Sequence, residues 1–180
     1  MVCDRCIMVV QQQLENLQLE ISSISLGVAT VNPEPDEGKL AEIASALKLL
    51  GFELIDSEKN KLIELIKNII IREVHYSNLS ESNINFSSLL AGKLNKDYAY
   101  LSRRFSEHED TTIEKYIIQQ KVEKVKELLQ YGELNQNEIA LQMGYSSSAH
   151  LSAQFKSIAG ITPSQFRSTT INSRKPIDKL

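Results

Sequence analysis

The sequence has no apolar run that approaches the ~20 residues a membrane helix needs, so no membrane-spanning segment is predicted. The N-terminus also lacks a basic region followed by an apolar one, which is the pattern of a secretion signal. Cysteine is scarce: Cys3 and Cys6 form a single C-x-x-C pair. Such a pair excludes a disulfide scaffold and is typical of a metal or redox role in a reducing compartment. A cytoplasmic location is therefore expected.

Strong positive charge is lacking as well. The chain has 20 Lys and Arg against 23 Asp and Glu, a net charge of −3. Residues 1–57 carry a net charge of −6 and residues 58–180 a net charge of +3, so any phosphate binding must be local to the C-terminal part. There is no convincing Ser/His/Asp set, catalytic carboxylate pair or Gly-rich phosphate loop. These absences give catalysis no support, and the chain is predicted not to be an enzyme.

What the sequence does contain is a dense series of helix signals near its C-terminus. Asn135 and Glu138 have the spacing of a capping box, which predicts the start of a short helix. Gly144 follows the last apolar position of that helix, where a left-handed residue commonly ends a helix. Leu151 and Phe155 lie four apart and predict the buried face of the next helix. Helix, tight turn and second helix together indicate a helix-turn-helix.

A third helix signal closes the stretch, with Gly160 ending one helix and Thr162-Pro163 starting another. The full order is I-A-x-x-x-G-Y-S at 139–146, L-S-x-x-F-K at 151–156 and G-x-T-P-x-x-F-R at 160–167. This order closely resembles the C-terminal half of the DNA-binding domain of AraC/XylS-type transcription regulators. The resemblance implies a sequence-specific DNA-binding regulator.

The same pattern occurs a second time, upstream. Residues 90–95 match 139–144 at an offset of 49, and residues 101–105 match 151–155 at an offset of 50. The one-residue change falls in the turn, where an insertion is tolerated best. Asn95 takes the place of the turn glycine, and asparagine tolerates the left-handed geometry. The sequence thus predicts a duplicated helix-turn-helix joined by a linker helix at about 112–130.

Residues 1–56 form a different unit, with the predicted order helix, strand, strand, helix, strand. The last strand is predicted from Phe52, Leu54 and Ile55. The M-x-C-x-x-C motif before the first helix, the hairpin and the Leu-Gly-Phe sequence resemble a heavy-metal-associated domain. That resemblance implies a small ferredoxin-like α/β sandwich, although this family has a strand before the motif and the sequence begins with the motif at Met1. Either the strand lies upstream of Met1 or the sheet lacks it.

The same resemblance implies that Cys3 and Cys6 bind a soft metal ion. A helix N-terminus stabilises thiolate, the form that binds metal, and soft ligands favour Cu(I) or Zn(II). The regulator would then respond to such an ion.

In a helix-turn-helix, the second helix enters the major groove and presents the side chains opposite its core face. Arg103 is the strongest candidate for a base contact, because its planar fork can pair with both acceptors of guanine. The second recognition helix offers mainly small side chains, which predicts modest discrimination. The candidate DNA-contacting residues are Tyr98, Ala99, Ser102, Arg103, Ser148, Ala149, Ser152, Ala153 and Lys156. The candidate phosphate contacts are Lys96, Arg104 and Arg167.

The predicted organisation is a heavy-metal-associated-like domain at 1–56, a connecting helix and linker at 57–85, a DNA-binding domain at 86–167 and a disordered tail at 168–180. The expected partner is double-stranded promoter DNA, with RNA polymerase and a second copy of the chain as further partners. Two alternatives stay open. The chain could be a metal-handling or thiol-redox protein whose helical part is an interaction module, or its N-terminal domain could serve only dimerisation.

Overall fold

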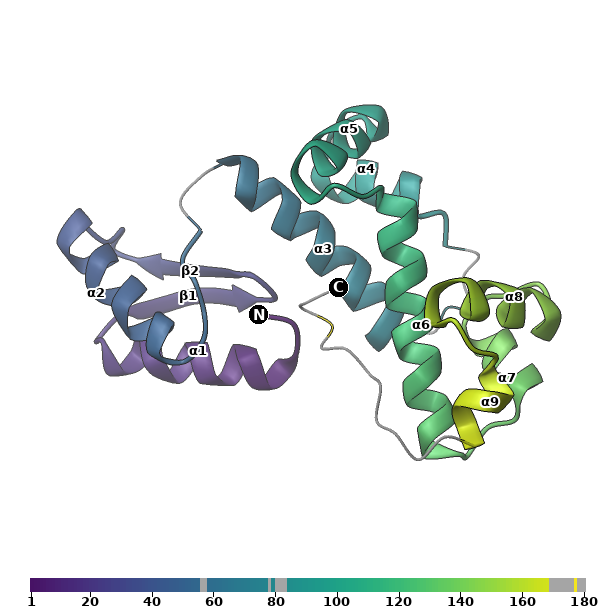
Figure 1. Cartoon of the computed structure of the whole chain (residues 1–180). Helices are drawn as coiled ribbons and strands as arrows, with labels where there is room; N and C mark the ends of the chain where they lie inside the picture. The colour runs from purple at the N-terminus through teal and green to yellow at the C-terminus, as the bar shows by residue number, and fades with distance from the viewer. Residues whose placement is uncertain (56–57, 78, 80–83, 169–176, 178–180) are drawn as a thin grey trace. The chain divides into compact units, whose positions relative to one another are not determined.

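The computed structural model describes residues 1–55, 58–77, 79, 84–168 and 177, with only the backbone at residues 58 and 59. The chain divides into two compact units, Met1–Asn68 and Ile69–Leu180. Their elements are labelled in Figure 1. No helix in the described part of the chain is long and apolar enough to cross a membrane.

The first unit contains α1 (Asp4–Asn16), the antiparallel hairpin of β1 (Glu20–Ser25) and β2 (Val28–Asn32), and α2 (Glu37–Leu49). Helices α1 and α2 each place two buried residues in one small core. Its fully buried members are Val10, Leu14, Ile43 and Leu47, and its half-buried members are Met1, Leu17, Leu19, Ile21, Ile24, Val31 and Phe52.

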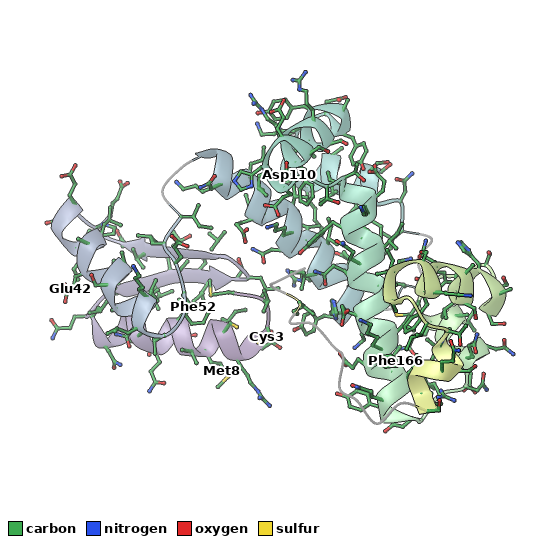
Figure 2. All side chains as sticks on the ribbon, viewed as in Figure 1. Cys3, Met8, Glu42, Phe52, Asp110 and Phe166 are labelled. Carbon is green, nitrogen blue, oxygen red and sulfur yellow. The ribbon has the colours of Figure 1, made fainter. Side chains whose placement is uncertain are left out.

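The predicted last strand of this unit is wrong. Residues 52–55 are not in a strand, and the sheet has two strands. The reason lies at Phe52, which is labelled in Figure 2. Its N–H donates to the Leu47 carbonyl at 3.0 Å, so this N–H caps the end of α2 and does not pair with a neighbouring β-strand. Its ring packs on the core. The described residues of this unit therefore form a helix–hairpin–helix arrangement and not a four-stranded ferredoxin-like sheet.

Helix α3 (Glu58–Tyr76) is the predicted connecting helix and crosses the boundary between the two units. Several of its apolar residues are fully buried. Ser57, the first residue of the predicted connecting segment, lies outside the described residues, as does most of the predicted linker and of the predicted tail.

The second unit is helical in its described part and is built around α6 (Figure 1). After α3 its helices are, in chain order, α4 (Phe86–Leu94), α5 (Tyr98–Glu109), α6 (Ile113–Tyr131), α7 (Gln136–Gln142), α8 (Ser148–Ala159) and α9 (Pro163–Ser168). Helix α6 contacts α5, which precedes it in the sequence, and α7, α8 and α9, which follow it. It is the predicted linker helix, and it gives both helix pairs a common support.

Polar side chains help to join α6 to the helices around it. Gln120 is fully buried, accepts from His75 of α3 at 2.8 Å and donates to the Tyr116 hydroxyl at 3.0 Å. The buried pair Lys126–Glu123, at 2.6 Å, lies further along the helix. The Lys126 ammonium also lies 6.0 Å from the ring centroid of Phe166, so the pair packs against α9. Buried polar groups persist when they are paired in this way.

Candidate nucleic-acid interface

Helices α4 and α5 form the first helix pair. The Asn85 side chain caps α4 by accepting from the Ser87 and Ser88 N–H groups, and Asp97 caps α5 by accepting from Ala99. Between them Asn95 adopts φ 50° and ψ 45°, the left-handed geometry expected of a turn residue. Helix α4 therefore ends, and α5 begins, at residues suited to a tight turn.

Helices α7 and α8 form the second pair. Asn135 and Glu138 make the predicted capping box at the start of α7, with the Glu138 carboxylate accepting from the Asn135 N–H at 2.6 Å. Gly144 has φ 67° in the turn, and Ser147 caps α8. An added Cβ at Gly144 would lie 3.3 Å from the Leu79 carbonyl oxygen, so the turn is also closely packed.

The capping residues and the aromatic pairs of the two helix pairs correspond at an offset of 50, and the turn residues Asn95 and Gly144 at an offset of 49. Phe105 of α5 packs on Tyr116 of α6, and Phe155 of α8 packs on Phe166 of α9, with ring centroids 5.6 Å apart in both. Figure 2 labels Phe166 on α9. The capping residues Asn85, Asp97 and Thr112 correspond to Asn135, Ser147 and Thr162. Equivalent packing leaves equivalent faces of α5 and α8 outward.

On α5 that outward face carries charge. Arg103 and Ala99 are exposed and Ser102 is half-buried. Tyr98 is different: its hydroxyl donates to the Glu114 carboxylate, so it ties the start of α5 to the start of α6. Burial and the Glu114 carboxylate raise the pKa of the Tyr98 phenol.

Two predicted phosphate contacts meet at one aromatic ring on the same pair. The Lys96 Nζ lies 5.6 Å and the Arg104 guanidinium 5.5 Å from the centroid of the Tyr100 ring. Arg104 also pairs with Glu107 of its own helix at 3.2 Å. Contacts with Tyr100 and Glu107 raise the pKa of Arg104, which stays fully cationic. Sequence reasoning missed Tyr100, although its i, i+4 spacing from Arg104 was readable.

On α8 the exposed predicted residues are Ala149, Ala153 and Lys156. Ser148 and Ser152 are half-buried, and Gln136 of α7 contacts both, donating from Nε2 to the Ser152 hydroxyl and to the Ser148 carbonyl. The structure thus uses part of this face to fasten α8 to α7. Gln136 has no motif of its own in the sequence that could have revealed this contact.

Arg167, predicted to contact phosphate, donates from its guanidinium to the carbonyl of Leu134 just before α7. This bond joins the end of α9 to the loop that leads into the second pair. The same backbone is supported at its other end, where the Lys121 ammonium donates to the Met143 carbonyl at 3.1 Å. Burial lowers the pKa of Lys121. Both cations bond to backbone carbonyls at the two ends of α7, Lys121 from a half-buried position and Arg167 from the surface.

The predicted metal ligands lie in the other unit. Cys3 and Cys6 are free thiols with sulfur atoms 3.4 Å apart at the start of α1 (Cys3 is labelled in Figure 2). Burial opposes ionisation of Cys6, but hydrogen bonds with the Val2 backbone and with Cys3 outweigh it, so the pKa of the Cys6 thiol is lowered. Among the described residues no group of three or more His, Cys, Asp or Glu side chains could hold a metal ion. Two adjacent sulfur ligands fit a soft ion of low coordination number and not a four-ligand zinc site.

Residues 90–169 match the family model described as a helix-turn-helix domain. The chain is also similar to the Msm operon regulatory protein of Streptococcus mutans, with 29% identity over 134 residues that make up 74% of this chain and 46% of that protein. The chain thus spans about half the length of this relative.

Two solved structures resemble part of the chain. The C-terminal domain of the two-component response regulator yesN from Fusobacterium nucleatum is 34% identical, with a TM-score of 0.50, and the match covers 58% of this chain and 96% of that one. The C-terminal domain of AraT, a response regulator from Geobacillus stearothermophilus, is 26% identical, with a TM-score of 0.53, covering 67% and 95%. The three similar proteins are a regulatory protein and the C-terminal domains of two response regulators, which supports the prediction of a non-enzymatic protein. Residues 90–169 therefore contain a helix-turn-helix domain, and these similarities support the resemblance to AraC-type regulators predicted for the C-terminal part of the chain.

Proposed function

We propose that this protein is a sequence-specific DNA-binding transcription regulator whose two helix pairs are duplicated helix-turn-helix motifs. The observation that carries the proposal is the matched packing of α5 and α8 on α6 and α9, which leaves one face of each outward. A face of this kind, on the second helix of such a pair, enters a major groove. The partner is double-stranded promoter DNA, and the protein acts in the cytoplasm.

In this proposal Arg103 reads a base. It is exposed and makes no hydrogen bond or ion pair in the described part of the chain, so its guanidinium is available for the two acceptors of guanine. Ala99 and Ser102 accompany it on α5, and Ala149 and Ala153 offer methyl contacts on α8. Lys96, Arg104 and Lys156 bind phosphate, which positions the protein without specifying sequence.

Three predicted contacts take a smaller part. Tyr98, Ser152 and Arg167 are already hydrogen-bonded to Glu114, Gln136 and Leu134. A side chain that exchanges one hydrogen bond for another gains little net free energy. We assign these three to holding the motifs together, and Ser148 to close backbone approach.

The test begins with selection of bound fragments from genomic DNA by the full chain, followed by fluorescence anisotropy on the recovered site. Arg103→Ala plus Lys156→Ala should weaken binding at least tenfold at moderate salt, because the double variant can pair with neither the guanine nor one of the phosphates. The matched control is Arg5→Ala plus Lys48→Ala, which removes one arginine and one exposed lysine from the acidic unit. Equal binding by the two double variants would contradict these contact assignments.

A second function is favoured by the thiol pair. We propose that Cys3 and Cys6 bind a soft metal ion such as Cu(I), or Zn(II) with ligands from elsewhere, because their sulfur atoms are 3.4 Å apart and the pKa of Cys6 is lowered. Metal binding here would make DNA binding metal-responsive, or would serve metal handling alone. Cu(I) titration of the reduced protein, repeated on Cys3→Ser and Cys6→Ser, tests the site; unchanged uptake by both variants would remove it.

The remaining partners follow from the regulatory role. A bound regulator would contact RNA polymerase, and a second copy of the chain would pair through the first unit. Sedimentation of the full chain and of Cys3→Ser with and without Cu(I) measures whether a homodimer forms and whether metal controls it.

A further inference from the structure

An arrangement of two cations around one ring distinguishes the first helix pair from the second. Lys96 lies in the turn before α5, and Tyr100 and Arg104 lie one helical turn apart on α5. Both cationic groups are within 5.6 Å of the Tyr100 ring centroid. At the position 50 residues later stands His150, whose Nδ1 pairs with the Ser146 hydroxyl at 3.1 Å.

The charges around Tyr100 are not balanced within the protein. An aromatic face attracts a cation through its quadrupole, and two cations drawn to one ring repel each other. Glu107, 3.2 Å from Arg104, offsets one of them. The other, Lys96, is exposed and has no carboxylate partner among the described residues. The arrangement is therefore suited to an additional anion from outside.

We propose that Tyr100 is a positioning residue that holds Lys96 and Arg104 ready for the DNA backbone, so that the three side chains form one phosphate-binding cluster. This inference rests on the proposed DNA-binding function. Arg103 adjoins Arg104 on the same helix, so the cluster fixes the register in which Arg103 meets its base. Phosphate contacts commonly set register in this way. Glu107 competes with the phosphate for Arg104.

The ring can be separated from simple packing with two substitutions. Tyr100→Leu keeps an apolar side chain but removes the aromatic face, and Tyr100→Phe keeps the face and removes the hydroxyl. The readout is the slope of log affinity against log salt concentration, whose magnitude decreases by about 0.9 for each duplex phosphate that the protein no longer neutralises. A purely structural role would lower stability without changing that slope.

Anisotropy titrations of the full chain on its selected site, at several salt concentrations, test the cluster. Tyr100→Leu should bind about tenfold more weakly at moderate salt with a slope reduced by about 1 to 2, and Lys96→Ala should have a slope reduced by about 1. Tyr100→Phe should stay within about threefold of the wild type, because the ring face is retained. Glu107→Gln should bind about threefold more tightly, because the competing carboxylate is gone.

Tyr131→Ala is the matched control, since it removes an exposed tyrosine from the last residue of α6. Thermal unfolding verifies that each variant is folded. A slope for Tyr100→Leu equal to that of the wild type would overturn the cluster and leave the proposed function intact. An equally weakened Tyr100→Phe would overturn the role of the ring, since the hydroxyl would then hold Arg104 or bind the phosphate. A wild type without salt-dependent DNA binding would overturn the proposed function itself.

Discussion

The two helix pairs of the second unit share their packing and differ in how they use polar side chains. In the α7–α8 pair the polar contacts are mostly internal: Gln136 fastens Ser152, Lys121 of α6 donates to the Met143 carbonyl, and Glu138 closes a capping box. The α4–α5 pair is braced too, by the Tyr98–Glu114 bond, but its Arg103 is exposed and unpaired in the described structure, and the Lys96 ammonium lies against an aromatic ring.

The difference separates two things that a sequence motif tends to combine. Internal bracing requires particular residues at particular spacings, so the second pair has the more recognisable sequence. Electrostatic attraction to DNA requires only exposed cations in roughly the right place. Under the proposed function, the half with the more recognisable sequence and the half that supplies the strongest DNA contact are different halves, and each prediction below tests one side of this division.

The largest expected effect tests whether the two halves are equally packed. Phe105→Ala and Phe155→Ala should each lower the free energy of unfolding by about 3–5 kcal/mol, because both rings are fully buried and each leaves a cavity beside its aromatic neighbour. Urea unfolding followed by circular dichroism measures both. Leu141→Ala, at a side chain 68% exposed, is the control and should change stability by no more than about 0.5 kcal/mol. A small change at either phenylalanine would show that its half is loosely packed.

The next effect concerns specificity. Arg103→Ala should remove about 1–3 kcal/mol of discrimination at one base pair, because alanine cannot pair with the two acceptors of guanine. Lys156→Ala should weaken binding almost uniformly across sequences, as expected of a phosphate contact. Competition with single-base variants of the selected site measures both. If Lys156→Ala and not Arg103→Ala reduced the discrimination between bases, the base contact would lie on α8.

The packing shared by the two halves could be predicted from sequence because it depends on local rules. Caps, turn residues and apolar spacing are set within a few residues, and Asn95, Gly144 and Thr162 all behave as predicted. What failed depends on contacts between distant residues. The Gln136–Ser152 and Arg167–Leu134 bonds join segments that no local pattern connects.

The first unit shows the same limit. Its helices and hairpin are local and follow from the sequence pattern, whereas a last strand needs a neighbouring strand to pair with. Residues 52–55 have the apolar composition of a strand, but Phe52 is engaged in capping α2. Strand composition alone therefore did not determine strand formation.

A smaller effect tests the two turns. Gly144→Ala should lower the free energy of unfolding by about 1–2 kcal/mol, because φ is 67° and the new Cβ would meet the Leu79 carbonyl at 3.3 Å. Asn95→Gly should change it by no more than about 0.5 kcal/mol, since glycine also accepts φ 50°. Thermal and urea unfolding measure both. Equal tolerance at the two sites would mean that the Leu79 backbone yields easily.

The smallest effect separates a simple cap from a reciprocal one. Asn85→Ala and Asn135→Ala should each cost about 1 kcal/mol of stability, because each removes an acceptor from two helix N–H groups. Glu138 returns a bond to the Asn135 backbone N–H, which Asn135→Ala leaves in place. Glu138→Ala should therefore also destabilise the helix relative to the wild type. Glu138→Gln should retain most of the stability, because glutamine also completes a capping box. A Glu138→Ala variant as stable as the wild type would show that the reciprocal bond does not stabilise the second pair, and bracing would then rest on Gln136, Lys121 and Arg167.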